Sequence, residues 1–129
     1  MTSRLTEVTV DCRDPERLAA FWCEVLDFTV IDRTEGKVEI GSWVPTVEQV
    51  LAGQMPPTLQ FIRVPEGKTG KNRLHLDVSP IDGGTDDEVT RLLGLGAVRR
   101  DLGQGPDRSW VVMADPEGNE FCVLRTLAP

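Results

Sequence analysis

Apolar and polar residues alternate over residues 5–12, a period-two pattern that predicts a half-buried strand. The polar face of this strand carries Glu7, Thr9 and Asp11. The sequence DPERLAAFWCEVL follows, in which Asp14 suits an N-cap, Pro15 suits the first helical position, and apolar residues recur at helical spacing. The pattern therefore predicts a strand followed directly by an amphipathic helix.

Three more strands are predicted before the middle of the chain. FTVID and KVEIGSW predict two strands joined by a turn at Glu35-Gly36, and TLQFIRV predicts a fourth, with Gln60 facing away from its apolar neighbours. PTVEQVLAGQMPP is predicted as a loop with at most one helical turn. The segment from Val44 to Pro57, which carries Met55, is either a lid over a ligand cavity or a plain surface loop.

The second half of the chain repeats this order. NRLHLDVS predicts a strand, and TDDEVTRLLGLG predicts a helix with Thr85 as N-cap, Glu88 completing a capping box and Gly94 or Gly96 at its end. AVRRDL, SWVVMAD and NEFCVLR supply three further strands. The polar face of the first of these strands carries Arg73, His75, Asp77 and Ser79, and one face of the last carries Glu120, Cys122 and Leu124.

The two halves align, because seven positions separate Glu7 from Asp14 and seven separate His75 from Asp82. An internal repeat outweighs local patterns in deciding a fold. We therefore predict an α+β domain over residues 1–129, built from two βαβββ modules at about residues 1–66 and 72–127. The modules are expected to form a curved, cup-shaped mixed sheet with the helices on its convex side. The polar strand faces then either line a cleft or face solvent.

Composition narrows the possible partners. The chain is 40% hydrophobic and 27% charged, as in soluble globular proteins, and its formal charge of −7 argues against nucleic acid or an anionic membrane as the main partner. The N-terminus lacks the apolar core of a signal peptide, and no apolar run reaches the length of a membrane span. The three cysteines lack CxxC spacing and are predicted to be reduced thiols, so we expect a cytoplasmic protein.

Three stretches carry a family resemblance: EVTVDCRDPERLAAFWCEVLDF, RLHLDVSPID and WVVMADPEGNEFCVL. They resemble the first strand and helix, the second-module strand, and the closing turn and strand of the vicinal oxygen chelate superfamily, which includes glyoxalases, bleomycin-resistance proteins and extradiol dioxygenases. In detail the chain is similar to actinobacterial glyoxalase-like proteins. The resemblance implies a homodimer and a divalent metal (zinc, nickel, manganese or iron) held by one residue from each of four strands.

The same resemblance places the four ligand positions on Glu7, Gln60, His75 and Cys122. Only His75 matches the usual pattern, because Glu7 replaces a His or Gln, Gln60 replaces a Glu, and Cys122 replaces the closing Glu. Zinc accepts carboxylate, imidazole and thiolate ligands, whereas an amide is a poor ligand. His75 and Glu7 are therefore the best candidates for metal ligands, with Gln60 and Cys122 at the remaining two positions.

Other residues on the predicted cleft face are candidates for ligand binding. Glu120 shares the face of Cys122 and would bind substrate or, like Glu7, act as a catalytic proton shuttle. Trp43 and Trp110 either wall the ligand cavity or pack in the core. Each candidate also has an ordinary structural interpretation: Cys122 as a small buried apolar residue, and His75 as a hydrogen-bonded strand residue. Asp77 is predicted to be structural, and Cys12 and Cys23 are predicted to face the helices and to be inert.

Two classes of function are compatible with these residues. The favoured one is a small-molecule binding protein of the bleomycin-resistance type without the standard metal site, because the residues that define the family's chemistry are the ones that differ. Such a protein would hold an aromatic or cationic small molecule, and an acidic face formed by Glu7, Asp11, Asp77 and Glu120 suits a basic ligand. The alternative is a metal-dependent lyase, isomerase or dioxygenase acting on a substrate with vicinal oxygens.

Overall fold

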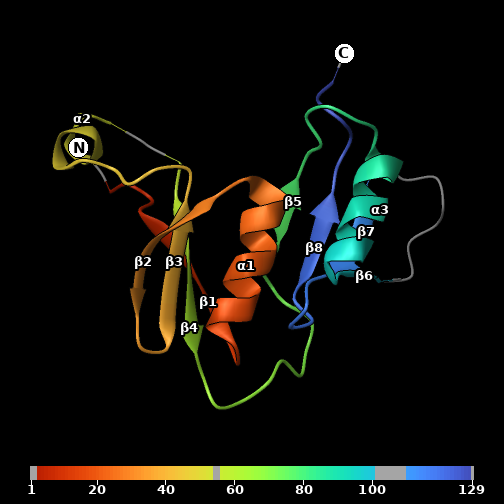
Figure 1. Ribbon diagram of the computed structural model, residues 1–129, viewed down its shortest axis with the longest axis horizontal. Coiled ribbons are helices and arrows are strands. Elements are labelled where there is room, and N and C mark those ends of the chain that lie inside the picture. Colours follow the sequence, from red (N-terminus) through yellow and green to blue (C-terminus); the bar gives the residue numbers. More distant parts are fainter. Residues whose placement is uncertain (1–2, 54–55, 101–109, 129) are drawn as a thin grey trace. The chain divides into compact units, whose positions relative to one another are not determined.

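The computed structural model describes residues 3–53, 56–100 and 110–128. The chain forms two compact units, Met1–Gly67 and Lys68–Pro129. Each unit contains a four-stranded mixed sheet with one helix of three turns packed against it (Figure 1). The prediction of an α+β fold with two βαβββ modules is confirmed.

The first unit adds one short helix to the βαβββ order. Its elements are β1 (Glu7–Cys12), α1 (Pro15–Leu26), β2 (Thr29–Thr34), β3 (Lys37–Gly41), α2 (Val47–Ala52) and β4 (Thr58–Arg63). The strands lie in the order β1-β4-β3-β2, with β1 parallel to β4 and the other neighbours antiparallel. The turn between β2 and β3 lies at Glu35 and Gly36, as predicted, and Gly36 supplies the positive φ of 75° that the turn needs.

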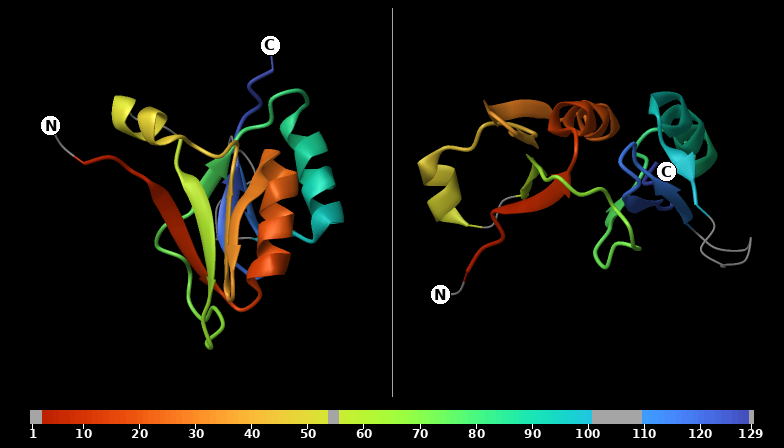
Figure 2. Two further views of the ribbon diagram at one scale, coloured as in Figure 1. Left: turned by 60° about the vertical axis from the view of Figure 1, so that its left-hand side comes forward. Right: turned by 90° about the horizontal axis from the view of Figure 1, so that it is seen from below.

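The second unit has the same topology with shorter strands. Its elements are β5 (Leu76–Val78), α3 (Thr85–Leu95), β6 (Val98–Arg99), β7 (Val111–Ala114) and β8 (Glu120–Val123). The order β5-β8-β7-β6 matches that of the first unit, and β5 is again parallel to its neighbour β8. Each of α1 and α3 covers one face of its own sheet (Figure 2), so the opposite face of each sheet is left for polar residues.

Helix α1 forms as its sequence predicts. The side chain of Asp14 accepts a hydrogen bond from the Arg17 amide at 3.2 Å, and Pro15 occupies the first turn. The helix ends at Asp27, a non-glycine residue in the left-handed region at φ 55°. The inner face of the helix packs on β3 and β4 through the buried side chains of Leu18, Ala19, Phe21 and Trp22.

The predicted cap of α3 is wrong. Gly84 is the N-cap, no side chain caps the helix, and Thr85 is already the first helical residue. The Thr85 hydroxyl instead donates a hydrogen bond to the Leu124 carbonyl at 3.0 Å, and Glu88 pairs with Arg91 on the helix surface rather than completing a capping box. The end of the helix at Gly96, with φ 112°, follows the prediction.

Two other boundaries differ from the sequence prediction. The segment expected to be mostly loop contains α2, whose capping box joins Thr46 and Gln49; Met55 lies outside the described residues. The strand expected over residues 72–79 is limited to Leu76–Val78. The Asn72 amide donates to the Glu120 carboxylate instead of joining a strand ladder, so the chain enters β5 only after His75.

The turn that precedes β8 explains the DPEGNEF sequence. One oxygen of the buried Asp115 carboxylate accepts hydrogen bonds from the amides of Glu117 and Asn119, both at 2.9 Å. Gly118 adopts the left-handed conformation at φ 88°, which glycine adopts without steric cost. The turn fixes where β8 begins and therefore which residues of β8 face away from α3.

Candidate functional site

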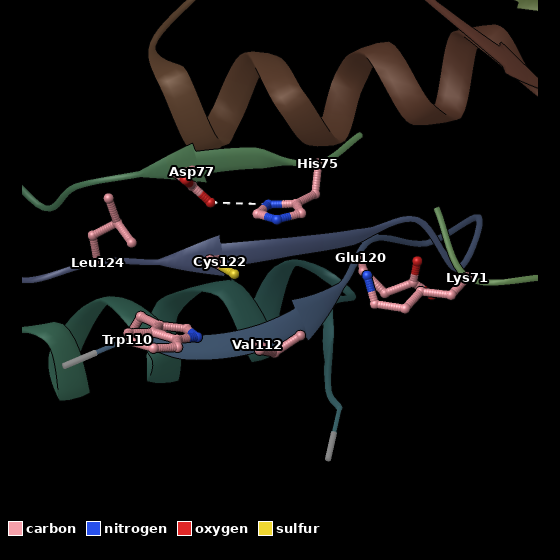
Figure 3. A pocket seen from close by; sticks show the side chains of 8 residues that line it. All are labelled: Lys71, His75, Asp77, Trp110, Val112, Glu120, Cys122 and Leu124. Carbon is pink, nitrogen blue, oxygen red and sulfur yellow. Dashed lines mark ion pairs between the residues drawn. The ribbon is translucent and has the colours of Figure 1, made fainter. Parts of the chain in front are cut away.

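The candidate site is a cavity of about 320 Å³ in the second unit. Alternate residues of β8 and the residue that follows it form one wall, and β7 and the segment around β5 contribute the others (Figure 3). The residues that line the cavity are Lys71, His75, Asp77, Trp110, Val112, Glu120, Cys122 and Leu124. The predicted common face of Glu120, Cys122 and Leu124 is therefore the face that meets the cavity.

His75, Asp77 and Cys122 form a compact polar cluster within this cavity. The parallel register of β5 and β8 places Asp77 beside Cys122, and His75 lies two residues before Asp77 on the same face. His75 Nδ1 is 3.0 Å from Asp77 Oδ1. One candidate ligand atom from each of the three side chains lies within 4.8 Å of the other two. An imidazole, a carboxylate and a thiol thus converge on one point of the cavity wall.

Glu120 lies near the cluster but is held by other groups. Its carboxylate accepts a hydrogen bond from Lys68 Nζ at 2.6 Å and one from the Asn72 amide at 2.8 Å. Burial raises the pKa of Glu120, but the hydrogen bonds from Lys68 and backbone amides, with the charge of Lys68, outweigh burial and lower the pKa overall. Two donors therefore hold the Glu120 carboxylate at the edge of the cavity, and its expected role as a substrate ligand or proton shuttle stays a prediction.

The remaining predicted site residues lie in the first unit. Glu7 is exposed on β1, and Gln60 is buried on β4, where its side-chain oxygen accepts a hydrogen bond from the Thr9 hydroxyl at 3.4 Å. Trp43 follows β3 and donates a hydrogen bond to Gln49, beside a crevice of only about 20 Å³. The structure brings His75, Cys122, Glu120 and Trp110 together; a ligand set that also includes Glu7 and Gln60 remains a prediction.

Sequence reasoning missed several residues of the cavity. Asp77 was counted in the acidic face but expected to be structural, and its pairing with His75 at the cavity wall was not predicted. Lys68 and Lys71 were not among the predicted site residues, although Lys68 pairs with Glu120 and Lys71 lines the cavity. The pairing could have been predicted, because Asp77 follows His75 at the two-residue spacing that keeps side chains on one face of a strand. No comparable signal marks the two lysines.

The cavity contains three side chains that could bind a metal ion, and only two of them lie at the expected ligand positions. Imidazole, thiolate and carboxylate are the three side-chain types that bind zinc. His75 and Cys122 occupy two positions of the ligand set expected from the family resemblance, while the third donor of the cluster, Asp77, is outside that set. The cluster therefore fits a metal through a ligand set that differs from the expected one.

The described parts of the chain contain no helix with the length and apolar character needed to cross a bilayer.

Comparison with known proteins agrees with the fold. Residues 7–124 match the glyoxalase-like domain family. A glyoxalase/bleomycin resistance protein/dioxygenase family enzyme from Burkholderia phytofirmans is 20% identical with a TM-score of 0.68, the alignment covering 97% of this chain and 100% of that one. A search of curated proteins found no significant match.

Two further structures are similar. FosX, a fosfomycin resistance protein from Listeria monocytogenes determined in complex with Mn(II) and a dihydroxypropylphosphonic acid, is 13% identical with a TM-score of 0.69. That alignment covers 98% of this chain and 92% of FosX. The trypanothione-dependent glyoxalase I of Leishmania major is also 13% identical, with a TM-score of 0.62 and coverage of 96% and 87%. At such identities these similarities show a shared fold.

Proposed function

The chain belongs to the glyoxalase-like domain family, and we propose that it binds a small organic molecule in the cavity of its second unit without the family's usual four-residue metal set. One observation carries this proposal: a cavity of about 320 Å³ combines an aromatic and aliphatic wall with a few converging polar groups. Ligand sites commonly have volumes of about 300–1,000 Å³ and this division between apolar walls and a few polar groups.

The cavity has two chemically different parts. Trp110, Val112 and Leu124 supply apolar surface, and Trp110 is 37% exposed, so a bound ring would remove its indole from water. Lys71, His75 and Asp77 supply polar groups. A ligand that fits both parts has a flat aromatic ring and at least one polar or charged substituent.

The charges around the cavity revise the ligand expected from the sequence. An acidic face was predicted to favour a cationic ligand. Lys68 neutralises Glu120, and the Lys71 ammonium lines the same cavity as Asp77. Mixed charge selects by the placement of polar groups more than by net charge. An aromatic molecule with a hydrogen-bonding or zwitterionic substituent therefore fits better than a simple cation.

The similar structures support the binding of small molecules in this fold, because FosX was determined with a dihydroxypropylphosphonic acid. The same structure contains Mn(II), which supports the alternative of a metal-dependent lyase, isomerase or dioxygenase. At the family's metal-ligand positions this chain has Glu7 where a His or Gln is usual, and Gln60 where a Glu is usual. We therefore keep ligand binding as the main proposal.

The test is ligand binding in the presence of EDTA. A panel of small aromatic compounds bearing an amine, a phenol or a carboxylate is screened by thermal shift, and each hit is measured by calorimetry with and without chelator. We expect affinity to survive chelation. Trp110→Ala should weaken it by roughly 10-fold or more, because aromatic contacts contribute about 1 kcal/mol beyond the area they bury.

Leu93→Ala is the matched control, because Leu93 is an exposed apolar residue of α3 outside the cavity. It should bind like the wild type. Affinity that disappears with chelator would favour the metal-dependent alternative, and affinity that Trp110→Ala leaves unchanged would exclude this cavity as the binding site.

Two further expectations belong to the proposal. All three cysteines, which the structure describes, are thiols and not disulfide partners, as expected in a reducing compartment, and we place the protein in the cytoplasm. We also propose that residues 1–129 form a single domain and that the protein is a homodimer, as the family resemblance implies. The similarity to actinobacterial glyoxalase-like proteins likewise stays part of this proposal. Light scattering after gel filtration would measure twice the 14.3 kDa chain mass for a dimer.

A further inference from the structure

We propose that His75, Asp77 and Cys122 form a zinc-binding site contained entirely within the second unit. The site needs neither Glu7 nor Gln60, and it replaces the expected closing carboxylate by a thiolate. The inference goes beyond ligand binding in the cavity, because metal binding by these three side chains requires no organic molecule.

The geometry of the cluster is close to that of a metal site. All three ligand atoms lie within 4.8 Å of one another, and His75 Nδ1 is already 3.0 Å from Asp77 Oδ1. Bonds of about 2.0–2.3 Å in tetrahedral zinc sites put ligand atoms roughly 3.3–3.8 Å apart. A small side-chain rotation of Cys122 or His75 would therefore bring the three atoms to coordination distance.

The backbone holds the cluster in place. Asp77 and Cys122 are register partners on the parallel strands β5 and β8, and Cys122 lies between two other ladder residues that are buried, Phe121 and Val123. His75 precedes β5 directly. Ligands carried by paired strands keep their separation without a loop having to order, so little conformational entropy opposes binding.

The donor types select the metal. A thiolate with an imidazole suits zinc or cobalt, whereas manganese and magnesium prefer sites made of oxygen ligands. Cys122 is only 7% exposed, while the side chains of His75 and Asp77 are 39% and 46% exposed. An ion would enter from the open side of the cavity, with the sulfur at the base of the site. Three protein ligands leave a fourth position that faces the cavity and can take water or an oxygen of a bound molecule.

The competing interpretation is a His75–Asp77 ion pair beside a buried thiol that packs as an apolar residue. The two interpretations differ in what happens to the thiol. Metal coordination requires Cys122 to lose its proton to solvent as the sulfur–metal bond forms, with no change in oxidation state. Simple packing leaves the thiol protonated and indifferent to metal.

The first measurement is a cobalt titration of untagged wild-type protein stripped of metal with EDTA. We expect one Co²⁺ per chain, a near-ultraviolet absorption band from thiolate-to-cobalt charge transfer, and displacement of cobalt by one equivalent of Zn²⁺. Protons should be released as metal binds, and excess Mn²⁺ should not displace the cobalt. A titration without the charge-transfer band would overturn the proposal.

Variants then test each ligand. Cys122→Ser, His75→Gln and Asp77→Asn should each weaken Zn²⁺ binding by roughly 100-fold or more, since even changes to groups that only support ligands cost about 10–100-fold. Cys23→Ser and Asp87→Asn are matched controls, one thiol on α1 and one exposed acid on α3, and should leave affinity unchanged. Wild-type affinity in Asp77→Asn would overturn the three-ligand set, and equal losses in Cys23→Ser would indicate nonspecific thiol binding. Circular dichroism checks that each variant is folded.

Failure here is distinguishable from failure of the proposed function. Organic ligand binding is measured in EDTA, where no metal site can contribute, and the cobalt titration contains no organic ligand. Absence of metal binding would leave the cavity as a metal-free binding site.

Discussion

The two units share one backbone register and differ in the chemistry that the register carries. In the first unit β1 and β4 pair Thr9 with Gln60, and in the second β5 and β8 pair Asp77 with Cys122. The residue two positions before this pair is Glu7 in one unit and His75 in the other. The matching triplets are therefore Glu7, Thr9 and Gln60 in the first unit, and His75, Asp77 and Cys122 in the second.

The first triplet is suited to hydrogen bonding and the second to binding metal. A hydroxyl and an amide already bond each other in the first unit. The second unit replaces them with a carboxylate and a thiol, and replaces a carboxylate with an imidazole. Since the strand order is the same in both, the fold gives the two units matching positions, and the side chains give those positions different chemistry.

The helix-facing sides of the sheets do not differ in this way. Phe61 of β4 and Phe121 of β8 are both almost completely buried. Phe61→Ala and Phe121→Ala should each lower the free energy of unfolding by about 3–5 kcal/mol, through lost transfer energy and an unfilled cavity. Urea denaturation of both variants measures the two losses. The two losses should agree within about 2 kcal/mol, which is the width of the range expected for such substitutions. A larger difference would mean that the two cores are not equivalent.

The next largest effect should come from exchanging the triplets. A variant with His75→Glu, Asp77→Thr and Cys122→Gln gives the second unit the residue types of the first, and it should lose Zn²⁺ binding by at least about 100-fold. Its circular dichroism spectrum should stay native, because Gln60 is accommodated at the matching position. Calorimetry with Zn²⁺ measures the loss. Retained affinity would show that the metal binds elsewhere.

Most of the fold was predictable because it depends on periodicity. Alternation in β1, the capped stripe of α1 and the repeat of seven positions each follow from local residue types. The predicted cap of α3 was wrong because the Thr85 hydroxyl donates to the Leu124 carbonyl, which lies far away in the sequence. The predicted start of the second-module strand at residue 72 was wrong for the same reason, because the Asn72 amide donates its hydrogen bond to Glu120. Long-range partners override local preference, and no local pattern reveals them.

The sequence predicted which strands carry the candidate site, but not which side chains pair with one another there. His75 and Cys122 were identified from the family resemblance, Glu120 from the strand face that it shares with Cys122, and Trp110 as an aromatic residue; all four line the cavity. What the pattern did not contain was the pairing of Lys68 with Glu120 across 52 positions. That pairing holds the Glu120 carboxylate in place, and the role of Glu120 as a proton shuttle stays a prediction.

Breaking the Lys68–Glu120 pair should have a moderate effect. Glu120→Gln should lower the free energy of unfolding at pH 7 by about 1–3 kcal/mol, because it leaves the part-buried Lys68 ammonium without its acceptor charge. Thr58 occupies the matching position of β4 and bonds to Glu39 instead, so the first unit has no corresponding charge pair at that position. Urea denaturation of Glu120→Gln measures the loss, with the exposed Glu48→Gln as control.

The same pair predicts a pH dependence. The folded pKa of Glu120 lies below its ordinary value of 4.5, so its stabilisation is fully present above about pH 4.5 and is lost as pH falls through the lowered folded pKa. The difference in stability between wild type and Glu120→Gln should therefore be constant from pH 7 to 5 and shrink below that. A constant difference down to pH 3 would contradict this assignment of the carboxylate.

The smallest effect is expected at the ion pair on the surface of the first unit. Arg33 Nε lies 2.7 Å from Glu16 Oε2, but both side chains are more than half exposed, at 54% and 55%. Water and salt screen such a pair, and ordering two long side chains offsets most of the attraction. Arg33→Ala should therefore unfold at the same urea concentration as the wild type, within experimental error, at both low and high salt. A clear destabilisation that disappeared with added salt would mean that this exposed pair stabilises the first unit as the part-buried Lys68–Glu120 pair is expected to stabilise the second.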